Sequence, residues 1–297
     1  MNPTLRIAAA VEFSAHAHAD QRRKGPSARP YFNHLAKVAQ LVTEATRGDD
    51  PDLTIAAYLH DCIEDQGVTE AEIAARFGDD VANLVAAVTD DKSLGKAERK
   101  RLVIAHAAHK SARAKLLKLA DLVANLSDLL EHPPANWSVE RVQGYFDWAA
   151  EVVDGLRSGT PALDAPDLLQ TFDALHARRG EAKAGPVVHP LALAVKIAAT
   201  AHTTHKPDKG GAPYILHPLR MMMRMDNDEA RMAAVLHDVV EDHRDEGWTF
   251  ERLAEEGIPA PVIEALRCVT KTDEEERDKE GMYLPFVRRA AANPVAR

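Results

Sequence analysis

The hexapeptide His60-Asp61-Cys62-Ile63-Glu64-Asp65 returns later in the chain as His237-Asp238-Val239-Val240-Glu241-Asp242. A Pro-Tyr-x-x-His segment precedes each copy, ending at His34 in the first and at His217 in the second. Composition alone gives roughly 0.007 strings of the form His-Asp-x-x-Glu-Asp in such a chain. The repetition therefore indicates one domain fold that occurs twice, and metal-type ligands beside paired carboxylates indicate hydrolytic metal chemistry.

The bulk composition describes a chain of 297 residues with 45% hydrophobic residues and a net charge of -9. This length has room for two modest domains, and the negative charge disfavours broad binding to nucleic acid or anionic membranes. Only two cysteines occur, and no apolar run approaches the roughly 20 residues that span a bilayer. We expect a soluble, cytoplasmic protein without a disulfide framework, a signal peptide or a membrane segment.

Apolar residues recur at three- and four-residue spacing almost throughout, and β alternation is scarce, so the fold class is predicted to be all-α. In the first half, the expected helices cover 4–20, 34–46, 52–65, 69–76, 79–89, 96–109, 111–131, 137–157 and 166–178. Thr69 with Glu72 forms a capping-box pattern, and Ser138 is a weaker candidate cap. Residues 180–188 look like a linker, which separates expected domains at 1–180 and 189–297.

The metal site begins with the expected helix over 52–65. Its residues His60 and Asp61 are adjacent, and carboxylates follow four residues on, at Glu64 and Asp65. We expect these pairs to stack along one edge, so that His60 and Asp61 bind one ion. Such imidazole and carboxylate ligands suit Mn²⁺, Fe²⁺ or Zn²⁺.

Two further ligands must come from elsewhere, and the candidates are His34 and Asp121. His34 follows a turn-like segment, and Asp121 is embedded in an apolar helix, where an unpaired carboxylate is costly. The alternative interpretations are a histidine at a helix N-terminus and a carboxylate paired with Lys118 or Arg113. Glu64 and Asp65 could also be a solvated turn, although acids at a helix C-terminus oppose the helix dipole.

Residues 5–180 resemble the HD-domain hydrolases of the RelA/SpoT type, in particular the small stand-alone alarmone hydrolases. The matching strings are Gln21-Arg22-Arg23-Lys24, Pro30-Tyr31-Phe32-Asn33-His34, His60-Asp61-x-x-Glu64-Asp65, Val88-Thr89-Asp90-Asp91-Lys92, Glu98-Arg99-Lys100-Arg101, Ala114-Lys115-Leu116-x-Lys118-Leu119-Ala120-Asp121 and Trp137-Ser138-x-x-Arg141-Val142-Gln143-x-Tyr145-Phe146-x-Trp148-Ala149. The resemblance implies two tandem HD-domain helical bundles with Mn²⁺ as the metal. It implies the ligand set His34, His60, Asp61 and Asp121.

The reaction implied by this resemblance is removal of the 3′-pyrophosphate from (p)ppGpp, which gives GDP or GTP and pyrophosphate. Glu64 and Asp65 are the expected catalytic residues, since they could orient or deprotonate the metal-bound water. The expected substrate-binding residues are Arg23, Lys24, Lys96, Asn125, Arg141 and Tyr145. For the basic and surface residues among these, the alternative is a solvated turn or helix surface.

The second copy keeps His217, His237, Asp238, Glu241 and Asp242, but residues 205–211 replace the basic run of the first copy. The residue corresponding to Asp121 would fall beyond Arg297. We therefore expect this half to be catalytically weak or inactive, a packing or regulatory partner. Three ligands could still hold a metal if water completes the coordination.

Two rival functions stay open. One is another nucleotide phosphohydrolase activity, such as an NADPH 2′-phosphatase, which Lys96 and Arg141 could favour. The other is a non-catalytic alarmone-sensing module, which the complete set of metal-type residues in the first half argues against. The expected partner is a small nucleotide, with no nucleic acid or membrane, and a homo-oligomer is possible.

Overall fold

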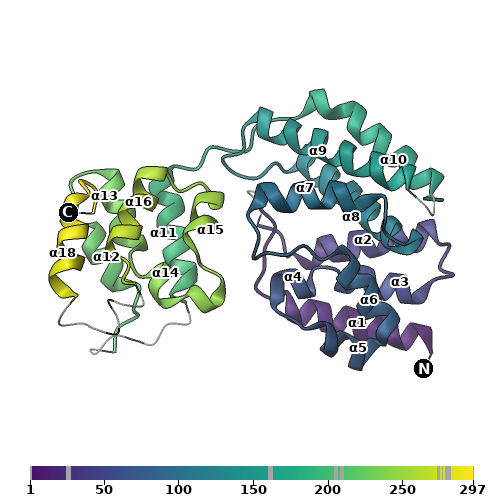
Figure 1. The fold of residues 1–297 in the computed structure, drawn as a ribbon, viewed down its shortest axis with the longest axis horizontal. Coiled ribbons are helices and arrows are strands. Elements are labelled where there is room, and N and C mark those ends of the chain that lie inside the picture. The colour runs from purple at the N-terminus through teal and green to yellow at the C-terminus, as the bar shows by residue number, and fades with distance from the viewer. Residues whose placement is uncertain are drawn as a thin grey trace. The chain divides into compact units, whose positions relative to one another are not determined.

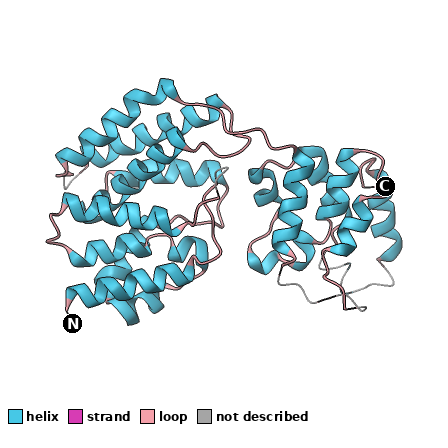
Figure 2. Ribbon diagram, turned by 180° about the vertical axis from the view of Figure 1, so that it is seen from behind, coloured by secondary structure: helices cyan, strands magenta, loops and turns pink. Residues whose placement is uncertain are grey.

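The computed structural model describes residues 2–24, 28–159, 163–203, 207, 211–272, 275, 277 and 282–296. Its described residues form helices joined by loops, without a strand, as the cyan ribbons of Figure 2 show. The only β feature among them is an isolated bridge between Arg22 and Pro30. The all-α prediction is therefore confirmed for the described residues. In the second copy, residues 205–211 replace the basic run. Of these, residues 205, 206 and 208–210 lie outside the described residues.

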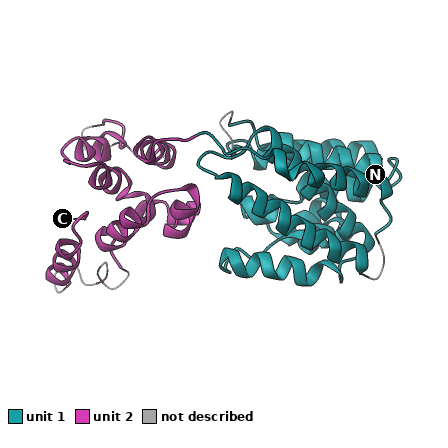
Figure 3. Ribbon diagram, turned by 90° about the horizontal axis from the view of Figure 1, so that it is seen from above, with its two compact units in different colours: residues 1–186 teal, residues 187–297 magenta. Residues whose placement is uncertain are grey.

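The chain divides into two compact units, which we call unit 1 (Met1–Pro186) and unit 2 (Val187–Arg297). Figure 3 distinguishes them in teal and magenta. The segment expected to be a linker is partly bound to unit 1: the Gly185 N–H donates to the carbonyl of Trp137 at 2.9 Å, and the Asn136 N–H donates to that of Pro186 at 3.1 Å. Unit 1 thus extends past residue 180 because this segment pairs with the loop before Trp137.

Unit 1 is a bundle in which one long helix is central (Figure 1). Its helices are α1 (Pro3–Ala17), α2 (Phe32–Ala45), α3 (Pro51–Leu59), α4 (Cys62–Gln66), α5 (Glu70–Phe77), α6 (Asp79–Val88), α7 (Lys96–Ala107), α8 (Ala112–Glu131), α9 (Val139–Ser158), α10 (Pro166–Ala177) and the 3₁₀ turn η1 (Arg178–Glu181). Helix α8 packs against α2, α3, α6, α9 and α10. Its apolar residues are buried on more than one face, which is why the polar Asp121 on it is enclosed by other helices.

Local signals explain where these helices begin. The Asp50 side chain accepts from the Leu53 N–H, and Pro51 occupies the first turn, where a missing N–H costs nothing. Thr69 and Glu72 form the expected capping box, and the Ser138 hydroxyl accepts from the N–H of Arg141. Both predicted caps are therefore present.

One helix prediction is wrong: the single helix expected over 52–65 is divided into α3 and α4 at His60 and Asp61. Asp61 has φ -100° and ψ -1°, which departs from helical geometry, although its carbonyl still accepts from the Asp65 N–H at 2.8 Å. Helix α4 then ends at Gly67, whose φ of 66° favours glycine. The apolar periodicity runs through the break and therefore does not reveal it.

Unit 2 repeats the order of the first elements of unit 1. It contains α11 (Pro190–Ala201), α12 (Leu216–Met222), α13 (Asp228–Leu236), α14 (Val239–Asp242), the 3₁₀ turn η2 (Arg244–Glu246), α15 (Phe250–Glu256), α16 (Ala260–Val269) and α18 (Tyr283–Ala292). The core of unit 2 is formed by side chains of α11, α13, α14, α15 and α16 and of the loops beside them. No helix in the described parts of the chain is long and apolar enough to cross a membrane.

Candidate metal centre and active site

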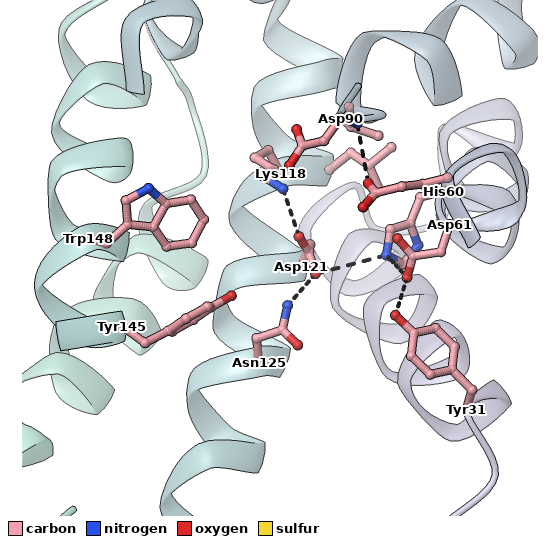
Figure 4. A pocket seen from close by; sticks show the side chains of 12 residues that line it. Tyr31, His60, Asp61, Asp90, Lys118, Asp121, Asn125, Tyr145 and Trp148 are labelled. Atoms are coloured by element: carbon pink, nitrogen blue, oxygen red, sulfur yellow. Dashed lines mark hydrogen bonds and ion pairs between the residues drawn. The ribbon is translucent and has the colours of Figure 1, made fainter. Parts of the chain in front are cut away.

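The four predicted ligands come from three places in unit 1. His34 lies in the first turn of α2, and His60 and Asp61 form the break between α3 and α4. Asp121 lies near the middle of α8. Packing of α8 against α2 and α3 brings these places together, and Figure 4 shows His60, Asp61 and Asp121 meeting at one point.

One ligand atom from each of His34, His60 and Asp121 lies within 4.8 Å of the others, and Asp61 lies beside the two histidines. Asp61 Oδ2 lies 3.0 Å from His60 Nε2 and 3.7 Å from His34 Nε2. Asp121 Oδ1 lies 3.3 Å from His34 Nε2 and 3.9 Å from His60 Nε2. Two atoms that bind one ion at about 2.1 Å are roughly 3 to 4 Å apart, so all four distances fit a shared divalent cation.

His60 is oriented as a ligand by its own helix. Its Nδ1 donates to the Ala57 carbonyl at 2.8 Å, which leaves the Nε2 lone pair directed at the carboxylates. This buried Nε2 has no hydrogen-bond partner among the described residues. A buried ring nitrogen that faces two carboxylates without a well-directed hydrogen bond, although Asp61 Oδ2 lies only 3.0 Å away, fits a metal ligand.

The charges around His60 favour a cation at this point. Burial alone would lower the pKa of His60, but Asp61 and Asp121 outweigh it and raise that pKa to about 9. Burial would likewise raise the pKa of Asp61, yet His60 and His34 hold it below its usual range. The Tyr31 hydroxyl donates to Asp61 Oδ2 at 2.8 Å and fixes the orientation of that carboxylate.

Asp121 has partners besides the histidines. Lys118 Nζ lies 3.0 Å from Asp121 Oδ2, and Asn125 Nδ2 donates to Oδ1 at 2.6 Å. Burial opposes ionisation of Asp121, but Lys118 and the histidines keep its pKa well below the usual value. Of the two alternative partners that the sequence suggested, Lys118 is the one observed, because Arg113 pairs with Asp50 and Asp80.

The two expected catalytic carboxylates occupy different surroundings. Glu64 lines the cavity beside the ligands, and its Oε2 accepts from the Asp90 N–H at 3.2 Å. Burial, followed by the charges of Asp61 and Asp90, raises the pKa of Glu64 to about 7. Asp65 lies outside the cavity wall, where it accepts from Gln21 Nε2 at 2.7 Å and pairs with Lys92.

The cavity next to the ligands has a volume of about 170 Å³. Its lining combines carboxylates, one lysine, an amide and aromatic rings: Tyr31, His60, Asp61, Glu64, Val88, Asp90, Leu117, Lys118, Asp121, Asn125, Tyr145 and Trp148. Figure 4 shows Tyr145 and Trp148 on α9, across the cavity from His60 and Asp61. The cavity therefore has metal-type ligands at one wall and, at the opposite wall, aromatic rings on which a planar group can stack.

The expected substrate-binding residues divide into two groups. Asn125 and Tyr145 line the cavity, and Arg23 reaches its edge, where Arg23 donates to the side chain of Asn125 at 2.9 Å. Lys24, Lys96 and Arg141 are exposed and do not line the cavity. The structure thus brings three of the six residues to the ligands.

Sequence reasoning assigned no role to Lys100 or Trp148, and it considered Lys118 only as a partner of Asp121. Lys100 Nζ lies over the rings of Tyr145 and Trp148, at 5.3 and 4.7 Å from their centroids. Burial, then the charges of Lys96 and Arg141, lowers the pKa of Lys100, so these cations lie close enough to influence one another. Helical spacing was the available signal, because Lys100 follows Lys96 by four residues and Trp148 follows Tyr145 by three.

Comparison with known proteins first gives the protein family to which unit 1 is similar. The model of a family described as "HD domain" matches residues 10–143, which lie within unit 1. The proteins named guanosine-3′,5′-bis(diphosphate) 3′-pyrophosphohydrolase MESH1 are among the relatives. That of Xenopus tropicalis is 49% identical over 158 residues, 53% of this chain and 88% of its own length. The human protein is 47% identical over 155 residues, 52% of this chain and 87% of its own length.

A solved structure extends the comparison to the fold. It is described as a metazoan ortholog of SpoT that hydrolyzes ppGpp, is 40% identical and has a TM-score of 0.57. The match covers 61% of this chain and 99% of that chain. The chain belongs to the HD-domain family that includes the MESH1 hydrolases.

Proposed function

We propose that unit 1 is a Mn²⁺-dependent hydrolase that removes the 3′-pyrophosphate from (p)ppGpp. The observation that carries the proposal is the convergence of His34, His60, Asp61 and Asp121 beside a polar cavity. Its support from relatives is the activity for which the MESH1 proteins are named, since this chain matches those proteins over most of their length.

The chemistry assigns separate roles to the residues around the ligands. A bound divalent ion lowers the pKa of its water and neutralises phosphate charge. Glu64 would accept a proton from the attacking water, because a carboxyl pKa near 7 suits a general base at neutral pH. As the water oxygen bonds to the phosphorus, the bond from phosphorus to the 3′-oxygen would break, and Glu64 would return its proton to the leaving 3′-oxygen. Asp65, held by Gln21 and Lys92, acts from outside the cavity wall as a positioning residue for this step.

The substrate would be held by cations and aromatic rings. Arg23 and Lys24 supply charge for the phosphates on the side of α8, and Lys96 and Arg141 do so on the side of α9. Asn125, one turn after Asp121, is placed for the ribose, and Tyr145 for the base.

One observation favours a second candidate, removal of the 2′-phosphate from NADPH. Lys96, Lys100 and Arg141 form a group of cations next to the aromatic wall, and the charges of the other two lower the pKa of Lys100. Such a group could bind an isolated phosphate on a larger dinucleotide.

An assay with both substrates tests the proposal. The full chain, freed of metal with a chelator and reloaded with Mn²⁺, is incubated separately with ppGpp and with NADPH. We expect pyrophosphate from ppGpp, with a larger kcat/KM than that for phosphate from NADPH, and no turnover before reloading. Phosphate from NADPH with no pyrophosphate from ppGpp would replace the first candidate with the second.

We also propose that residues 189–297 form a second HD-like domain. Its support is the order of elements, since α11 to α16 follow the order of α1 to α6, including a short helix directly after each His-Asp pair.

A further inference from the structure

The geometry points to a second divalent-metal site in unit 2, built from His217, His237 and Asp238. One atom from each of these side chains lies within 4.8 Å of the others. The site would take a first-row transition-metal ion, because two imidazoles and one carboxylate are ligands that such ions prefer.

The backbone that presents these residues repeats that of unit 1. His237 follows the end of α13 with φ -57° and ψ -36°, close to the -59° and -29° of His60 after α3. Asp238 precedes α14 with φ -92° and ψ -9°, close to the -100° and -1° of Asp61. A helix that breaks at the same two residues in both units directs both side chains to the same side.

The distances between ligand atoms repeat as well. His237 Nε2 lies 2.9 Å from Asp238 Oδ2, and His217 Nε2 lies 3.8 Å from the same oxygen. The equivalent distances in unit 1 are 3.0 and 3.7 Å. The rings of His217 and His237 have centroids 5.3 Å apart at 61°, the same values as those of His34 and His60. These spacings fit one ion bound at about 2.1 Å.

The contacts that orient the ligands are also present in unit 2. His237 Nδ1 donates to the Ala234 carbonyl at 2.8 Å, which leaves Nε2 as the coordinating nitrogen. The Tyr214 hydroxyl donates to Asp238 Oδ2 at 2.6 Å and fixes the carboxylate, as Tyr31 fixes Asp61. An ion pair between His237 and Asp238 would require neither His217 nor a hydrogen bond from the Tyr214 hydroxyl. Ion pairing alone therefore does not explain this arrangement.

The second site differs from the first in its exposure. The His217 side chain is 49% exposed, whereas that of His34 is 1% exposed. Within the described part of unit 2 the cluster has three ligands, and Glu241 is already paired with Lys271 at 2.9 Å. The exposure of His217 leaves the ion accessible to water and to an added ligand, so we expect it to bind more weakly than in unit 1.

Counting metal in the full chain tests this inference independently of hydrolysis. The chelator-treated protein is titrated with Co²⁺, the visible absorption is followed, and bound metal is measured after equilibrium dialysis. We expect wild-type protein to bind two ions, one tightly and one weakly. His60→Ala should retain only the weak site, whereas His217→Gln and Asp238→Asn should each retain only the tight site.

His189→Gln serves as the matched control, because His189 is an exposed histidine of unit 2 outside the cluster, and this variant should bind two ions. Circular dichroism of each variant verifies its folding, and His217→Gln is the safest substitution because half of that side chain is exposed. One ion in the wild type, or an unchanged weak site in folded His217→Gln and Asp238→Asn, overturns the inference. Since no nucleotide is present, failure here leaves the proposed hydrolysis untouched.

Discussion

The raised pKa of the Glu64 carboxyl suits a general base, but it also lowers the stability of the folded protein at neutral pH. Burial and the neighbouring carboxylates raise its pKa to about 7, so the folded protein favours the protonated carboxyl. A group with a raised folded-state pKa contributes stability below its unfolded pKa, and this contribution is lost as pH rises through the folded value. For Glu64 the loss falls between its usual value of 4.5 and about 7.

Glu64→Gln should therefore change the pH dependence of stability in chelator-treated protein. We expect the variant to gain about 3 kcal/mol in free energy of unfolding, relative to wild type, between pH 4 and pH 8. The glutamine oxygen can still accept from the Asp90 N–H, so the effect isolates the charge. Urea unfolding at the two pH values measures it, and parallel curves for both proteins would refute the assignment.

The buried ion pair of Lys118 and Asp121 allows a second test at this scale. Lys118→Met leaves Asp121 without its cation, which should lower the free energy of unfolding by about 3 kcal/mol in chelator-treated protein. Because a competing charge has gone, Mn²⁺ should stabilise this variant more than it stabilises the wild type.

Thermal unfolding with and without Mn²⁺ measures both effects. Lys37→Met is the control, since Lys37 is exposed and its Nζ donates to Gln40 Oε1 at 3.4 Å, on the surface of α2. An equal gain from Mn²⁺ in Lys118→Met and wild type would mean that Asp121 does not bind the ion.

The elements place the ligands in ways that the sequence predicted only partly. Helix positions, the Thr69 capping box and the burial of Asp121 follow from periodicity and turn chemistry. The break between α3 and α4 does not, because the apolar pattern continues through His60 and Asp61. The position of Lys100 beside Trp148 also escaped prediction, since Lys100 on α7 meets Trp148 on α9 only when the helices pack.

Helix α9, which carries Tyr145 and Trp148, contains two glycines. Their substitution by alanine is expected to change stability in opposite directions. A Cβ at Gly155 would lie 2.8 Å from Ala107 Cβ on α7, whereas one at Gly144 would have no atom within 4 Å. Gly155→Ala should lower the free energy of unfolding by about 1 to 3 kcal/mol. Gly144→Ala should raise it by about 0.5 to 1 kcal/mol, because alanine is the better helix former.

Denaturant unfolding of the two variants compares these positions directly. A stabilising Gly155→Ala would show that α7 and α9 pack less closely than the structure indicates.

For the whole molecule, the repeat was readable from sequence, because His-Asp-x-x-Glu-Asp and Pro-Tyr-x-x-His occur twice in the same order. The resemblance to HD-domain hydrolases is confirmed by the family match and the relatives. The difference in exposure between His34 and His217 was not readable, because it depends on which helices cover each residue. The catalytic weakness of the second half stays a prediction.

The two equivalent histidines provide the most direct test of the central claim, that (p)ppGpp is hydrolysed at the metal site of unit 1. Pyrophosphate release from ppGpp is measured with Mn²⁺-loaded full-length wild type, His60→Ala and His237→Ala. We predict that His60→Ala loses activity by at least about 1,000-fold, because it removes a metal ligand, and that His237→Ala keeps the wild-type rate. Activity that survives in His60→Ala, or that disappears in His237→Ala, would contradict the account.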